Sequence, residues 1–236
     1  MSWLKRNIPN LFTLANLTLG VLAIQQIIEA SPTNEPKVHY YVFLAAFFDL
    51  LDGAVARALK VTSNLGVQLD SLADLITFGV LPTFIYASIF EIDSWGYLIL
   101  LVPICSAIRL AIFNISDDQK TSFKGISTTA HGLFASTLPI IIWEGNSSFA
   151  QSLIDEPFIV VIMAIFFAYL MVSPLRMISL KFKGFGLAHN WEKYVLLAGG
   201  LALTLIFQFQ AAPWIMMIYL LLSIITNFRK AENAKS

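Results

Sequence analysis

Long apolar segments alternate with short polar ones along the whole chain. Most apolar segments are close to 20 residues long, about the length that an α-helix needs to cross the hydrocarbon core of a membrane. The pattern predicts spans at residues 8–29, 38–57, 66–90, 95–113, 128–143, 157–175, 192–209 and 212–228. We therefore predict an all-α integral membrane protein, a polytopic bundle of about eight transmembrane helices. A tight turn near Pro213 is expected between the last two.

The composition supports this interpretation. Of the 236 residues, 57% are hydrophobic and 13% are charged, whereas a soluble domain carries roughly 25% charged residues. The formal net charge is zero, so bulk charge gives no reason to expect a nucleic-acid partner. The single cysteine, Cys105, excludes an intrachain disulfide.

The distribution of Lys and Arg tests the number of spans. With eight spans, Lys37 lies on one side and the other 14 of the 15 Lys and Arg residues lie on the opposite side. Such an excess marks the cytoplasmic side, so both termini are expected in the cytoplasm. The first apolar segment lacks a cleavage site with the right flanks and is too long for a signal peptide, so it is expected to remain as a span.

Four aspartates interrupt the second and third apolar segments. They are Asp49, Asp52, Asp70 and Asp74. Spacings of three and four residues put each pair on one helix face, and both pairs lie at a similar distance from the intervening turn. An ionised carboxylate in hydrocarbon is costly unless it is paired, hydrated or bound to metal. The four side chains are therefore predicted to meet at about 13–19 Å from the turn.

Converging carboxylates favour a divalent cation, because Mg²⁺ prefers oxygen ligands and is often shared with substrate phosphates. Two such ions can clamp a phosphoryl group during a displacement. Gly53, Ala56 and Gly66 leave room beside the carboxylates, and the planar donors of Arg57 suit phosphate. The alternatives are a structural ion-pair cluster or the ion site of a cation- or proton-coupled transporter. Transporters often contain inverted repeats and broken helices, and the sequence shows neither.

The stretch DLLDGAVAR at 49–57, followed by GVQLDSLAD at 66–74, resembles the signature of the CDP-alcohol phosphotransferases. The resemblance implies a metal-dependent transfer of a substituted phosphate from a CDP-linked donor to an alcohol, with release of CMP. By position, it implies that Asp49, Asp52, Asp70 and Asp74 bind two divalent ions, Mg²⁺ or Mn²⁺, and that Asp74 is also the general base. It further implies CDP contacts from Asp49, Asp52, Gly53, Ala56, Arg57 and Gly66.

Other stretches resemble the branch of this family that joins CDP-diacylglycerol to L-serine. They lie at 8–16, 62–74, 78–82, 108–114, 123–125 and 171–173, with Lys181. The resemblance implies phosphatidylserine and CMP as products. The chain shows no repeat and no low-complexity segment, so we expect a single membrane domain, 1–236. Within it we expect a core at 8–181 that resembles this family and two additional helices at 192–228. Ala54 and Ile112 stand where that branch often has Arg, so glycerol 3-phosphate and inositol remain alternative acceptors.

A stripe of polar and small residues runs along the first predicted helix. Asn10, Thr13, Asn16 and Gly20 recur at helical spacing and are expected to face the bundle interior. Asn10 and Thr13 are candidates for contact with the CDP donor. The alternative is a role in helix capping for Asn10 and in packing between helices for the others.

The acceptor or its phosphate has a separate set of candidate contacts, Arg109, Ser71, Lys124 and Lys181. The alternatives are a snorkelling Arg109, a Ser71 that bonds to its own backbone, and lysines that face lipid headgroups. Asn114 is expected to stop a helix. A compact bundle with short tails favours the bacterial inner membrane, surrounded by membrane lipids. The resemblance also implies a homodimer, and an active site near the cytoplasmic face lets the donor lipid stay in hydrocarbon.

Overall fold

The computed structural model describes residues 3–31, 33–89, 95–116, 124–178 and 187–233. In this part, β pairing is limited to an isolated antiparallel bridge between Lys124 and Arg176. The α-helices are α1 (Trp3–Ile28), α2 (Val38–Leu59), α3 (Asn64–Asp74), α4 (Leu81–Ile89), α5 (Leu101–Ile115), α6 (Thr128–Ser136), α7 (Leu138–Glu144), α8 (Ser148–Asp155), α9 (Pro157–Val172), α10 (Leu187–Phe207) and α11 (Ala212–Asn233). A π-helix, η1 (Leu75–Val80), and two 3₁₀ helices, η2 (Gly96–Leu100) and η4 (Gln208–Ala211), extend them. The all-α prediction is confirmed.

Several helical runs are long and apolar enough to cross a membrane. Four qualify, Asn7–Ile28, Asn64–Ile89, Gly96–Ile115 and Asn190–Asn227. A fifth is added if α8 and α9, which meet at a bend of 103°, form one broken span. Many Leu, Ile and Phe side chains on the outer helix faces are exposed, as expected of a surface in lipid. The protein is thus a helical membrane protein with four to five candidate spans, and the eight-span count stays a prediction.

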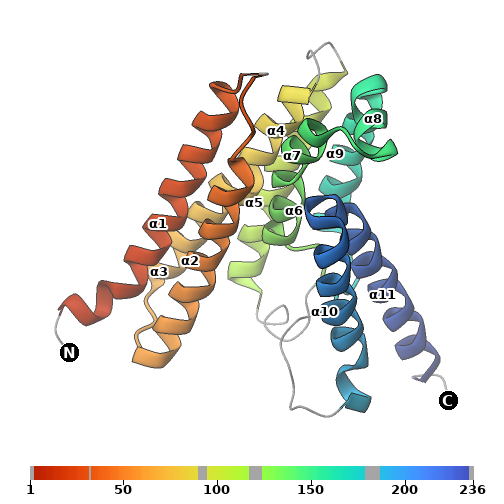
Figure 1. Cartoon of the computed structure of the whole chain (residues 1–236). Helices are drawn as coiled ribbons and strands as arrows, with labels where there is room; N and C mark the ends of the chain where they lie inside the picture. Colours follow the sequence, from red (N-terminus) through yellow and green to blue (C-terminus); the bar gives the residue numbers. More distant parts are fainter. Residues whose placement is uncertain (1–2, 32, 90–94, 117–123, 179–186, 234–236) are drawn as a thin grey trace.

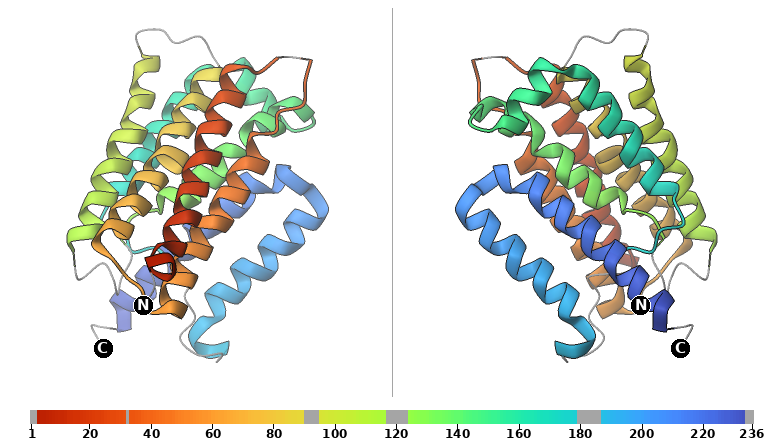
Figure 2. Two further views of the ribbon diagram at one scale, coloured as in Figure 1. Left: turned by 90° about the vertical axis from the view of Figure 1, so that its left-hand side faces the viewer. Right: turned by 90° about the vertical axis from the view of Figure 1, so that its right-hand side faces the viewer.

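The helices lie side by side in a bundle, and the start of α1 and the end of α11 lie at the same end of it (Figure 1). Helix α1 packs along α2, while α3, η1 and α4 follow one another along the other side of α1. Helices α10 and α11 form an antiparallel hairpin at one side of the bundle (Figure 2). They are joined by η4, which ends two residues before Pro213, so the turn predicted near this proline is confirmed.

The hairpin of α2 and α3 is closed by local interactions at both helix ends. Lys60 takes the left-handed conformation that ends many helices, with φ of 55°, and its N–H points to the carbonyls of Ala56 and Arg57. The Ser63 side chain accepts a hydrogen bond of 3.0 Å from the N–H of Gly66 and caps α3. The chain therefore reverses within residues 60–63, and the predicted hairpin is confirmed.

Close contacts between helices depend on glycines, as is common in membrane bundles. Gly20 of α1 lies against η1, where an added Cβ would overlap the Thr77 hydroxyl and lie 3.0 Å from the Thr77 Cα. Gly132 of α6 packs in the same way, since an added Cβ would lie 2.8 Å from the Cα of Phe78. Phe78 is fully buried in the core between these helices.

We expect Gly20→Ala to destabilise the protein by about 1–3 kcal/mol, because an added methyl group forces α1 away from η1. The measurement is thermal unfolding in detergent. Gly200→Ala is the matched control, because its Cβ would lie 3.9 Å from the nearest Ile215 atom. Equal destabilisation by the two substitutions would contradict the close contact described for Gly20.

Candidate active site

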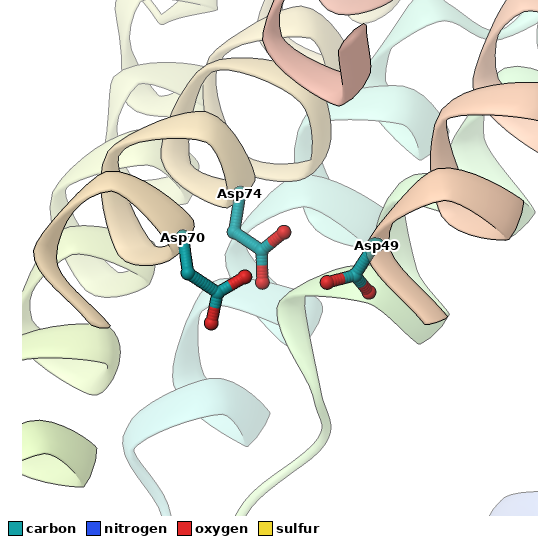
Figure 3. Close-up of side chains that lie close together, drawn as sticks. All are labelled: Asp49, Asp70 and Asp74. Carbon is teal, nitrogen blue, oxygen red and sulfur yellow. The ribbon is translucent and has the colours of Figure 1, made fainter. Parts of the chain in front are cut away.

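Three aspartates face one another across the α2–α3 hairpin. Asp49 projects from α2, and Asp70 and Asp74 project from α3 (Figure 3). One carboxylate oxygen from each residue lies within 4.8 Å of the other two, and all three side chains are partly buried. The meeting of these three residues, predicted from their spacing around the turn, is confirmed.

The donor set of this cluster fits a hard divalent cation. Three carboxylate oxygens at this separation repel one another, and a cation of two positive charges would relieve the repulsion. Mg²⁺ requires oxygen ligands and often keeps positions for water and for substrate phosphates. The three side chains of Asp49, Asp70 and Asp74 offer such a partial set.

Asp52 lies on the same helix as Asp49, but the structure does not bring its carboxylate into this cluster. It is 7% exposed, and its Oδ2 accepts a hydrogen bond of 2.6 Å from the Thr13 hydroxyl of α1. This bond ties α1 to α2 beside the cluster. Metal binding by Asp52 and a CDP contact by Thr13 stay predictions.

The general-base candidate, Asp74, is oriented by α1. The Asn16 amide donates a hydrogen bond of 3.2 Å to Asp74 Oδ1, and Asn16 is fully buried. The Thr77 hydroxyl in turn donates to the Asn16 carbonyl, at 3.2 Å. The prediction that the stripe on α1 faces the interior is confirmed by the burial of Thr13 and Asn16. The contact between Asn16 and Asp74 was not predicted, because the helical spacing within α1 does not identify the partner of each side chain.

The predicted CDP contacts gather toward the closed end of the hairpin. A Cβ at Gly53 would lie 3.2 Å from Arg57 Nη1, so the exposed guanidinium lies over the glycine. Ala56 is half-buried one residue before Arg57. A Cβ at Gly66 would lie 3.1 Å from Asn10 Oδ1, which places α1 directly beside the first turn of α3. At both glycines the space that a Cβ would need is bordered closely by other side chains, Arg57 at Gly53 and Asn10 and Ser63 at Gly66, so the missing Cβ permits these close contacts.

The predicted acceptor contacts are partly assembled. Arg109 is 7% exposed, and its Nε has no hydrogen-bond partner in the part of the chain that the structure describes. Together with Lys124 and the end of α9, it lines a cavity of about 210 Å³. Arg109 is therefore not a snorkelling side chain at the surface, whereas Lys181 lies outside the described residues.

Ser71 neighbours the cluster and has a partner on another helix. Its hydroxyl accepts a hydrogen bond of 2.9 Å from the Asn114 amide, near the end of α5. Asn114 thus connects α5 to α3 in addition to standing one residue before the end of its helix. Sequence reasoning gave Asn114 only the second of these roles.

The backbone changes its winding directly after Asp74. Residues Leu75–Val80 form the π-helix η1, a feature that often occurs at functional sites. Within it, Gly79 packs so tightly that an added Cβ would lie 2.9 Å from Ser106 Cβ of α5. Sequence reasoning missed the π-helix, because the apolar run continues through it without a break.

The fold and site define a membrane-embedded bundle that gathers carboxylates suited to a divalent cation beside arginines suited to phosphate. The chain belongs to the CDP-alcohol phosphatidyltransferase family, whose model matches residues 6–154. The family resemblance carried by residues 49–57 and 66–74 is thereby confirmed.

Three relatives from different organisms bear the name CDP-diacylglycerol–serine O-phosphatidyltransferase. The chain is 34% identical to the Bacillus subtilis (strain 168) protein over 129 residues, which cover 53% of this chain and 71% of that protein. It is 29% identical to the Helicobacter pylori (strain ATCC 700392 / 26695) protein over 221 residues, which cover 92% of this chain and 89% of that protein. It is 35% identical to the Saccharomyces cerevisiae protein over 138 residues, which cover 55% of this chain and 50% of that protein. The Helicobacter match extends well beyond residue 154.

Proposed function

We propose that this protein transfers the phosphatidyl group of CDP-diacylglycerol to the hydroxyl of L-serine, giving phosphatidylserine and CMP. The observation that carries the proposal is the meeting of Asp49, Asp70 and Asp74 in a chain of this family. The names of its relatives favour serine as the acceptor.

Asp74 is the proposed general base. It takes the proton of the serine hydroxyl, and the hydroxyl oxygen forms a bond to the phosphorus that carries diacylglycerol. The bond from this phosphorus to the bridging anhydride oxygen breaks, and CMP leaves with that oxygen and its electron pair. The proton then passes from Asp74 to water. An alcohol is a weak nucleophile at neutral pH, so a positioned base accelerates the attack, and the Asn16 hydrogen bond fixes the orientation of Asp74.

The aspartates would also hold the divalent ions. Asp49, Asp70 and Asp74, joined by Asp52, are the proposed ligands of two Mg²⁺ or Mn²⁺ ions, which when bound would neutralise charge on the diphosphate. The guanidinium of Arg57 is the proposed pyrophosphate contact. The remaining proposed CDP contacts are Gly53, Ala56, Gly66, Asn10 and Thr13.

The acceptor site is proposed at the cavity that Arg109 lines. A buried guanidinium whose Nε has no partner among the described residues supports binding of a carboxylate, because arginine forms paired charge-assisted hydrogen bonds with such groups. Lys124 lines the same cavity and would add positive charge. Ser71 and Lys181 are the other proposed acceptor or phosphate contacts.

We further propose eight spans, with both termini in the cytoplasm of a bacterium and the protein in its inner membrane. An even number of spans is supported by the positions of α1 and α11, whose outer ends lie at the same end of the bundle (Figure 1). The proposed core at 8–181 carries all the site residues, and the hairpin of α10 and α11 is appended to it. We also propose a homodimer, and this proposal rests on the family resemblance alone.

We expect label from serine to enter lipid roughly a hundredfold faster than label from glycerol 3-phosphate or inositol, because a site built to pair a polar group rejects ligands that lack it. The measurement is transfer from CDP-diacylglycerol by the purified protein, with Mg²⁺ or Mn²⁺ and one labelled alcohol at a time. Clear incorporation of another alcohol, with no incorporation of serine, would contradict the proposal that serine is the acceptor. If no acceptor led to release of CMP, the proposed enzymatic activity would be wrong and a cation- or proton-coupled transporter would be the better hypothesis.

A further inference from the structure

A second cavity lies outside the site described above, between the end of α9 and the last turns of α11. Its volume is about 530 Å³, and it is lined by Tyr169, Leu170, residues 173–176 and Asn227. Ser173 and Pro174 also line the smaller Arg109 cavity, so the two cavities adjoin at these two residues. The family model, which ends at residue 154, includes none of this lining.

The charge at this cavity is entirely positive. Arg176 is exposed and is the charged residue of the lining, which contains no carboxylate. The isolated antiparallel bridge places Lys124 directly opposite Arg176, and residues opposite each other on two strands are side-chain neighbours. Like charges in such a pair are destabilising. Within the described part of the chain, neither residue has a carboxylate at salt-bridge distance.

The backbone around Arg176 is fixed on two sides. The Asn227 amide of α11 donates to the Arg176 carbonyl at 2.5 Å and to the Ser223 carbonyl at 2.9 Å. Two residues further along, the Ile178 N–H donates to the Ser223 hydroxyl at 3.2 Å. Together with the Lys124 bridge, these bonds hold the backbone of Arg176 in a defined place beside the cavity.

An apolar track leads along α9 to the same cavity. Ile162, Phe166 and Tyr169 are 49%, 46% and 65% exposed, and their spacing of four and then three residues puts them on one helix face. Tyrosine is enriched where the membrane core meets the headgroups. The track therefore ends at headgroup depth, beside positive charge.

We propose that this cavity binds a phospholipid with an anionic headgroup, separate from the reacting lipid. The headgroup phosphate lies at Arg176, the cation that lines this cavity, and an acyl chain follows the Ile162–Tyr169 track. A phospholipid satisfies both halves of the site, because its phosphate compensates the charge of Arg176 and its chain covers the exposed apolar side chains.

The test is native mass spectrometry of the purified full chain in neutral detergent, titrated with phosphatidylglycerol or phosphatidylcholine. We expect phosphatidylglycerol to be retained roughly five- to tenfold more strongly, and Arg176→Gln to remove this preference. Asn227→Asp, which places a negative charge in the lining, is expected to remove it as well. Lys60→Gln is the matched control, an exposed cation on the α2–α3 turn, and is expected to leave the preference unchanged.

Retention of phosphatidylglycerol that is equal in Arg176→Gln and the unaltered protein would overturn the proposal, as would an equal loss in Lys60→Gln. Displacement of the lipid by inorganic phosphate would show a site for free anions instead. Loss of CMP release by Arg176→Gln in neutral detergent would move Arg176 into the reaction site. The titration uses neither CDP-diacylglycerol nor serine, so its failure leaves the proposed transfer reaction untouched.

Discussion

Asp74→Asn is expected to lower turnover by at least about a thousandfold while CDP-diacylglycerol still binds, because the substitution removes the proposed general base. An asparagine of the same size can still accept the hydrogen bond that the Asn16 amide donates at 3.2 Å, so the packing of α1 against α3 is preserved. The measurement is the initial rate of CMP release at saturating divalent ion, with CDP-diacylglycerol binding measured separately.

The control for this substitution is Asp155→Asn, which changes an exposed carboxylate on α8. It is expected to leave the rate of CMP release and the binding of CDP-diacylglycerol unchanged. Normal turnover by Asp74→Asn would show that another group takes the proton of the acceptor. Loss of CDP-diacylglycerol binding in parallel with turnover would make Asp74 a residue that binds the donor rather than its base.

Asp49→Asn and Asp70→Asn are expected to weaken the binding of the divalent metal, and with it the binding of CDP-diacylglycerol. Each removes one of three carboxylates whose oxygens lie within 4.8 Å of one another. Loss of a direct metal ligand should cost at least as much as loss of a residue that supports one, which is about 10- to 100-fold in metal affinity. The Mn²⁺ concentration that gives half-maximal CDP-diacylglycerol binding should therefore rise by about a hundredfold.

A titration of CDP-diacylglycerol binding with Mn²⁺, followed by reversal with a chelator, measures this effect for each variant. Asp155→Asn serves again as the control for loss of one negative charge. If Asp49→Asn and Asp70→Asn both kept the metal dependence of the unaltered protein, the three carboxylates would not act as a common site for the cation.

Much of the fold and the central part of the site could be predicted because they depend on spacing within single elements. The intervals in Asp49–Asp52 and Asp70–Asp74 define a helix face, and the short turn aligns the two faces. The contact between Asp49 and the α3 aspartates follows from these two facts alone. Apolar runs of membrane-spanning length likewise predict the helical bundle.

The remaining site contacts depend on how separate helices are rotated against each other, which spacing does not determine. Asp52 shares a helix face with Asp49, yet its carboxylate accepts a hydrogen bond of 2.6 Å from the Thr13 hydroxyl of α1. The position of α1 is set by the close approach of Gly20 to Thr77. That approach also brings Asn16 to Asp74.

Helix breaks explain why the number of spans is harder to obtain than the fold class. The predicted span 128–143 is divided at Thr137 into α6 and α7, of 9 and 7 residues, each too short to cross alone. The residues from Asn190 to Asn227 form one helical run of 38 residues, although the run folds back on itself at η4 (Figure 2). The π-helix after Asp74 is similarly absent from the sequence pattern, because a single added residue in one turn leaves the apolar run unchanged.

The most direct test of the central claim is anomalous X-ray diffraction from crystals grown with Mn²⁺ and CDP-diacylglycerol. The proposed reaction predicts a manganese peak bounded by the carboxylates of Asp49, Asp70 and Asp74, in contact with the diphosphate of the donor. Manganese bound elsewhere, with these three carboxylates turned away from the donor, would contradict it.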